Sequence, residues 1–73
     1  MKGVKYNIEF YDLNGNKFNY MGLNMNETVA QIKLLVKDKC NLDIKISKHI
    51  VYNLIHRDNV NPFLKKICKV EKV

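Results

Sequence analysis

Hydrophobic and polar residues alternate along the N-terminal part of the chain. Between residues 4 and 10, every second side chain is apolar and those between are polar or charged, which is the period of a half-buried β-strand. Residues 12–16 contain asparagine and glycine, which tolerate the positive φ angles of a tight turn. A second strand is expected over residues 17–25. This part of the sequence therefore predicts an antiparallel β-hairpin.

The apolar positions of the second strand change parity partway along it. Phe18 and Tyr20 would face the core, but Leu23 has the opposite parity. One extra residue in the strand would return Leu23 to the same face as Phe18. Because glycine often marks such irregularities, we predict a β-bulge near Met21 and Gly22.

The next segment has the spacing of an amphipathic helix, over residues 25–38. Its apolar stripe consists of Val29, Ile32 and Val36. Thr28 is followed three residues later by Gln31, which fits a capping box and predicts Thr28 as the N-cap. Such a helix is about 18 Å long, enough to cover one face of a small sheet.

Two later segments have the composition of a third strand. Residues 42–46 alternate between apolar and polar side chains, and residues 49–55 are rich in β-branched and aromatic side chains. Either segment would serve, and we favour the second. Residues 58–62 are predicted to be a loop, because Pro62 would end regular pairing.

The last ten residues are predicted to form a final strand. Within residues 64–73, Cys68 and Val70 share one face, while Ile67, Lys69 and Glu71 share the other. A helix that crosses one face of a sheet returns the chain parallel to an earlier strand. We therefore expect the last strand to run parallel to the first, in the middle of the sheet.

Residues 6–42 resemble ubiquitin, whose fold is the β-grasp. The shared features are a strand with Ile8 and Phe10 inward, a turn with Leu13 two residues before Gly15, and a helix that starts TVAQIK. The expected fold class is α+β, a ubiquitin-like β-grasp with a mixed sheet of about four strands packed on one helix. Residues 1–73 would form a single ubiquitin-like domain.

The end of the chain differs from the conjugatable members of that family. Those proteins end in a flexible tail with two glycines, whereas this sequence ends CKVEKV. We therefore expect a module that is not attached to other proteins and that binds a partner without catalysis. A small subunit or assembly component of a larger complex fits this description. The abundance of lysine and asparagine is typical of A+T-rich genomes, and a viral protein is one version of this hypothesis.

The net charge favours an acidic partner. The 73 residues carry a formal charge of +6, which raises the rate of encounter with acidic molecules.

Two cysteines are too few for a disulfide framework, and the N-terminus lacks the apolar stretch of a signal peptide. An intracellular, cytoplasmic protein is expected. No apolar segment of the sequence is long enough to span a membrane.

The resemblance to ubiquitin also suggests where a protein partner would bind. Members of this family commonly dock through an exposed apolar patch on the outer face of the sheet. The matching apolar positions here would be Leu13, Val51 and Ile67. Their expected rim consists of Lys48, His49 and Lys69.

The lysine residues support an alternative hypothesis, in which the protein binds the phosphate backbone of nucleic acid. The candidate residues are Lys33, Lys37, Lys65, Lys66, Lys69 and Lys72. Tyr11, Tyr52 or Phe63 would be available for base stacking. Twelve of the thirteen basic residues are lysine, and Arg57 is the exception. Since bidentate reading of bases favours arginine, contacts would be nonspecific.

The sequence predicts neither a catalytic group nor a cofactor. His56 and Asp58 form a local pair, but no serine or cysteine is placed by the sequence to act as their nucleophile. Cys40, His49, His56 and Cys68 lack the close spacing of zinc ligands. We therefore expect a protein that is not an enzyme and holds no metal.

Overall fold

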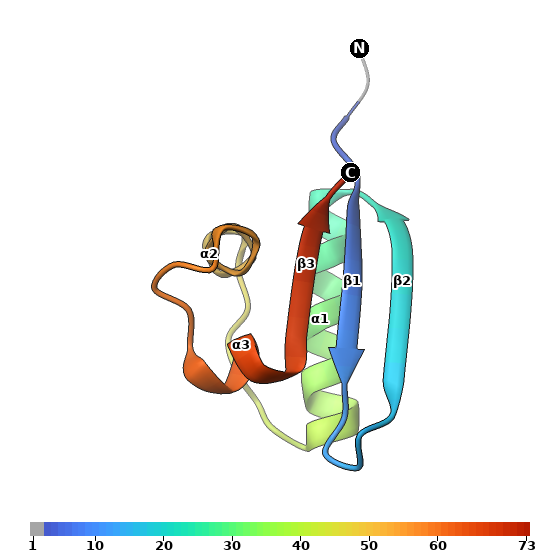
Figure 1. Cartoon of the computed structure of the whole chain (residues 1–73), viewed down its shortest axis with the longest axis vertical. Coiled ribbons are helices and arrows are strands. Elements are labelled where there is room, and N and C mark those ends of the chain that lie inside the picture. Colours follow the sequence, from blue (N-terminus) through green and yellow to red (C-terminus); the bar gives the residue numbers. More distant parts are fainter. Residues whose placement is uncertain (1–2) are drawn as a thin grey trace.

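The computed structural model describes residues 3–73 as a three-stranded β-sheet packed against helices (Figure 1). The strands are β1 (Tyr6–Tyr11), β2 (Lys17–Leu23) and β3 (Cys68–Lys72). The helices are α1 (Met25–Cys40), α2 (Lys48–His56) and α3 (Pro62–Ile67). The α+β class is confirmed. The expected mixed sheet of about four strands packed on one helix is not confirmed, because the described residues form an antiparallel sheet of three strands with three helices.

The central strand is β1, and both of its neighbours run antiparallel to it in the order β2-β1-β3. Phe10, near the end of β1, lies opposite Cys68 at the start of β3. The predicted parallel pairing of the first and last strands is therefore wrong. Figure 1 shows the reason: α1 carries the chain back along the sheet, and α3 delivers it to the end where β1 finishes. From there β3 runs opposite to β1.

The turn between β1 and β2 is held by Asp12. The Asp12 carboxylate accepts hydrogen bonds from the backbone N–H groups of Asn14 (2.9 Å) and Asn16 (2.8 Å). Gly15 has a φ of 84°, which glycine adopts without steric cost. The predicted hairpin is confirmed.

A β-bulge interrupts the pairing of β1 with β2. Ile8 lies opposite Tyr20. Two residues earlier on β1, Tyr6 lies opposite Leu23, which is three residues further along β2. Gly22 has a φ of 71°, and its N–H donates to a side-chain oxygen of β1 at 3.0 Å. The predicted bulge is confirmed, and Leu23 is half-buried beside the core.

The first turn of α1 is capped by Asn24. The Asn24 side chain accepts the N–H of Glu27 at 2.8 Å, and the Glu27 carboxylate accepts the N–H of Asn24 at 2.9 Å. This is a capping box. Thr28 lies within the helix and is fully buried, and its hydroxyl donates to the Asn24 carbonyl at 2.7 Å. The helix itself is confirmed, but the predicted cap at Thr28 is wrong.

Residues 48–56 form the helix α2, and the prediction of a strand over residues 49–55 is wrong. The Ser47 hydroxyl accepts the N–H of Ile50 at 3.4 Å and caps this helix. Val51 and Leu54 share its buried face, whereas a strand would place them on opposite faces. Residues 42–46, the other candidate, are also not a strand.

The last part of the chain begins with α3. The Asn61 side chain accepts the N–H groups of Phe63 (2.8 Å) and Leu64 (3.4 Å), and Pro62 occupies the first turn. The predicted final strand is therefore correct only from Cys68 onward. Within β3, Cys68 and Val70 face the core as expected.

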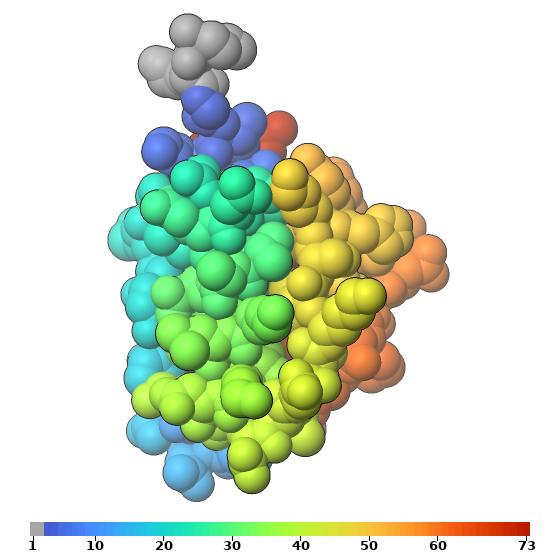
Figure 2. Space-filling view, turned by 180° about the vertical axis from the view of Figure 1, so that it is seen from behind, coloured from blue at the N-terminus to red at the C-terminus, as the bar shows by residue number. Residues whose placement is uncertain are grey.

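The core lies between one face of the sheet and the helices. Figure 2 shows α1 and the segment that follows it side by side over this face. The fully buried core side chains are Phe10, Ile8, Ile32, Leu54, Leu64, Val36 and Val51. Among the described elements, none packs over the other face of the sheet (Figure 1). In residues 3–73, no helix has the length and apolar character that crossing a membrane requires.

Candidate functional site

The apolar docking patch expected from the sequence does not form. Val51 belongs to α2 and is 0% exposed, and Ile67, at the end of α3, is 7% exposed. Only Leu13, at the tip of the hairpin, is open to solvent, with 66% of its surface exposed. Lys48 and His49 are exposed in the first turn of α2. The prediction that Val51 and Ile67 present an outer apolar face is therefore wrong.

The candidate lysines for nucleic acid fall into two groups. Lys65 and Lys66 from α3 and Lys69 from β3 line one groove. The others do not line it: Lys33 and Lys37 are exposed on α1, and Lys72 is exposed at the end of β3. The structure thus brings together three of the six predicted residues.

The groove has a volume of about 470 Å³, within the range of small-ligand sites. We call it the basic groove. Its walls come from β1, the end of α2, α3 and β3. The lining residues are Glu9, Tyr11, Arg57, Lys65, Lys66, Ile67, Cys68 and Lys69. Four cationic residues and one carboxylate line it, so the groove carries a net positive charge.

The ends of two helices bring these cations together. Arg57 is the C-cap of α2, with a left-handed backbone at φ 56°, and its N–H donates to the carbonyl of Asn53. Asn61 caps the start of α3, which places Lys65 and Lys66 in its last turn. Cations at these positions also interact favourably with the carbonyl ends of the helices.

Glu9, the carboxylate in the groove, is already partnered. Its Oε2 lies 2.8 Å from Lys17 Nζ and accepts a hydrogen bond from the Tyr11 hydroxyl at 3.1 Å. The interactions with Lys17 and then Tyr11 lower the pKa of Glu9, and Glu9 in turn raises the pKa of Lys17. The negative charge of Glu9 is thus offset by a lysine outside the groove.

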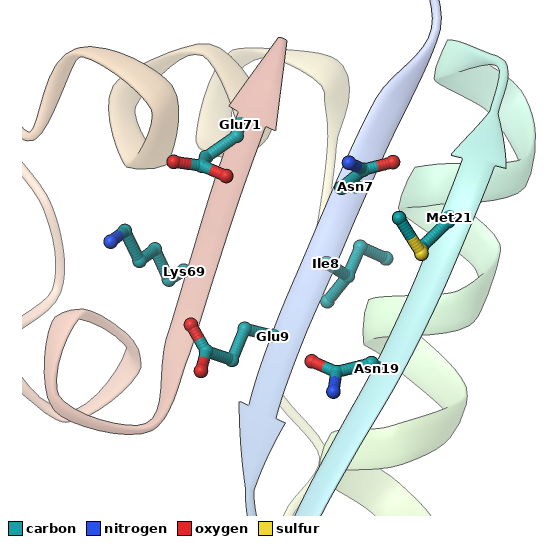
Figure 3. A pocket seen from close by; sticks show the side chains of 7 residues that line it. All are labelled: Asn7, Ile8, Glu9, Asn19, Met21, Lys69 and Glu71. Carbon is teal, nitrogen blue, oxygen red and sulfur yellow. The ribbon is translucent and has the colours of Figure 1, made fainter. Parts of the chain in front are cut away.

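A second, smaller hollow of about 280 Å³ lies on the open face of the sheet (Figure 3). It shares Glu9 and Lys69 with the basic groove. Its remaining side chains include Asn19 and Met21 from β2 and Glu71 from β3. With two carboxylates beside one lysine, this hollow lacks the positive charge of the basic groove.

The two cysteines are buried thiols. Burial raises the pKa of Cys68 to about 12 and also raises the pKa of Cys40. A thiol with a raised pKa is a poor nucleophile at neutral pH. Within residues 3–73, no three His, Cys, Asp or Glu side chains gather where a metal ion could be held.

Sequence reasoning missed Arg57 and Glu9 as parts of this site. Arg57 has no local signal, because left-handed caps are usually glycine or asparagine. The sequence did contain a signal for α3: asparagine followed by proline is a typical helix start, and Asn61-Pro62 has that form. This signal would have predicted that Lys65 and Lys66 belong to a helix.

Comparison with known proteins gives no match. No protein family matches the sequence, and neither a curated protein nor a solved structure is detectably similar to the chain. The resemblance to ubiquitin therefore stays a prediction from the residue pattern.

Proposed function

We propose that the protein is a non-catalytic module that binds the phosphate backbone of nucleic acid in the basic groove. The observation that carries the proposal is the convergence of Arg57, Lys65, Lys66 and Lys69 from three elements on one groove. Cations grouped in this way match the repeated negative charge of a phosphate backbone.

The charge of the whole chain supports the same partner class. The net charge of +6 attracts polyanions from a distance. Three of the four groove cations are lysines, which contact phosphates as point charges without bidentate geometry. Binding would thus depend on the backbone and little on base sequence, and it would weaken steeply as salt is raised.

Docking of a protein through a ubiquitin-like sheet face has less support. Two of its three apolar positions, Val51 and Ile67, lie in the core. A ubiquitin-like relationship would be limited to the hairpin and α1, because β3 runs antiparallel to β1 where a β-grasp has parallel strands. An acidic protein that fills the basic groove is a different outcome, which the following experiment separates.

The test is the affinity of the full chain for fluorescent oligonucleotides, measured by anisotropy at about 50 mM and about 200 mM salt. The groove variant carries Lys65→Gln and Lys66→Gln. The control carries Lys33→Gln and Lys37→Gln on α1, which removes the same charge outside the groove. We expect the groove variant to bind about tenfold more weakly at low salt, with a salt slope smaller by about 2, and the control to change about twofold.

Two results would contradict the proposal. Equal weakening by the groove and control variants would mean that net charge, not the groove, attracts nucleic acid. Absence of binding by the wild type at low salt would remove nucleic acid as the ligand. Capture of an acidic protein through Lys65 and Lys66 in that case would assign the groove to a protein partner.

A further inference from the structure

We infer that the basic groove selects single-stranded over duplex nucleic acid, because Tyr11 presents an aromatic ring for base stacking beside the cations. This inference rests on the proposed function and specifies its ligand. The observation behind it is that Tyr11 lines the same groove as Arg57, Lys65, Lys66 and Lys69.

The position of Tyr11 suits a stacking surface. Tyr11 is the last residue of β1, and 38% of its surface is exposed. Its hydroxyl donates to Glu9 at 3.1 Å, and Glu9 is itself held by Lys17 at 2.8 Å. The ring is thus tethered at both its backbone and its hydroxyl. A ring that is already ordered loses less conformational freedom when a base stacks on it.

The other aromatic candidates do not combine these features. Tyr52, on α2, is 48% exposed but does not line the groove. Phe63 is partly buried against the core and also lies outside the groove lining. Phe18 on β2 already has the ammonium of Lys39 over its ring, 4.9 Å from the centroid. Tyr11 is therefore the described aromatic residue that a phosphate-bound strand would reach.

The structure of the ligand determines whether the ring can be used. In a single strand, the bases turn away from the backbone and offer their faces to an aromatic side chain. In a duplex, those faces are stacked on neighbouring base pairs, so only the phosphates are available to the groove. Stacking on one ring corresponds to a gain of about tenfold in affinity, and a duplex does not obtain it.

The experiment compares three probes on the full chain: a single-stranded oligonucleotide, a duplex of the same sequence, and inorganic polyphosphate with a similar number of charges. Wild type should bind the single strand about tenfold more tightly than the duplex. Tyr11→Leu should lose this preference and keep its affinity for polyphosphate. Tyr11→Phe, which retains the ring but loses the hydroxyl tether, should keep most of the preference. Tyr52→Leu is the matched control that should change nothing.

The outcomes separate the two proposals. Equal or tighter binding of the duplex by wild type would overturn the inference without any variant, and would leave the groove proposal intact. An unchanged preference in a folded Tyr11→Leu variant would also overturn it. If none of the three probes binds wild type, the proposed function fails together with the inference.

Discussion

Glu9 and Lys17 lie diagonally across the β-hairpin, with 2.8 Å between the Glu9 carboxylate and the Lys17 ammonium. This pair sits at the margin of the basic groove, which Glu9 lines and Lys17 does not. Lys17 therefore masks the one carboxylate that would oppose a bound phosphate. Glu9 can therefore accept the hydrogen bond of the Tyr11 hydroxyl while the groove loses little of its positive charge.

The first prediction concerns this carboxylate. Glu9→Gln should raise the affinity for polyphosphate about threefold at low salt, since it removes a negative charge from the groove. Lys17→Gln should lower that affinity, because it leaves Glu9 unmasked. Polyphosphate is the suitable probe, as it has no base to stack on Tyr11. Unchanged binding by Glu9→Gln would show that Glu9 does not face the ligand, and weaker binding would contradict the predicted repulsion.

The second prediction concerns the start of α1. Asn24→Ala should lower the free energy of unfolding by about 1 kcal/mol, because it removes the acceptor for the N–H of Glu27. Asn26→Ala, in the same turn but without a capping bond, should change stability little or raise it slightly. Urea denaturation of both variants measures the difference. Equal effects would argue against a cap at Asn24.

The third prediction concerns acid. Hydrogen bonds from Asn16, first through its side chain, and from Asn14 lower the pKa of Asp12 from its usual value of 3.8. The ionised form is thus favoured by folding, and its contribution to stability is present above the usual pKa and is lost as pH falls through the lowered pKa. The free energy of unfolding should therefore decrease as the pH is lowered below about 4.

Asp12→Asn provides the control for this acid dependence. The variant lacks the titrating carboxylate, so its stability should change less between neutral and acid pH than that of wild type. Glu9, whose pKa is also lowered, still contributes in both proteins. An unchanged pH profile in Asp12→Asn would exclude Asp12 as a source of acid sensitivity.

The fourth prediction concerns Cys68. Because burial raises the pKa of Cys68 to about 12, the thiol should stay protonated and react with a disulfide reagent at least about a hundredfold more slowly in the folded than in the unfolded protein. The measurement uses a Cys40→Ala background. The stability contributed by the protonated Cys68 thiol should be fully present below the usual thiol pKa of 9.0, and it should decline as the pH rises toward 12. Rapid reaction near neutral pH would contradict its burial.

The hairpin and α1 could be predicted because their signals are local. Alternating side chains, an Asn-Gly turn and a parity change at Gly22 are all properties of neighbouring residues. Even the error in the α1 cap is local, since both Asn24 and Thr28 are followed three residues later by Glu or Gln. The two candidate caps differ in burial, which the sequence does not state.

The second half was harder because its elements depend on tertiary packing. The run from Ile50 to Ile55 is apolar at most positions, and such short runs fit a buried helix or a strand equally well. Burial of Val51 and Leu54 against α1 and β3 selects the helix. The basic groove could not be derived for the same reason, because its cations lie on elements whose arrangement only the fold defines.

At Arg57, the backbone conformation lowers the stability of the fold, while the side chain adds a positive charge to the basic groove. Among the described residues, the non-glycine positions with positive φ are Asn41, Arg57 and Asn59. Asparagine tolerates this conformation, whereas an arginine there carries a strain of about 1 kcal/mol. Arg57→Gly should therefore make the protein more resistant to denaturant and should weaken its binding of polyphosphate. At the end of α2, a strained backbone lowers the stability of the fold and holds a charge that the proposed binding surface would use.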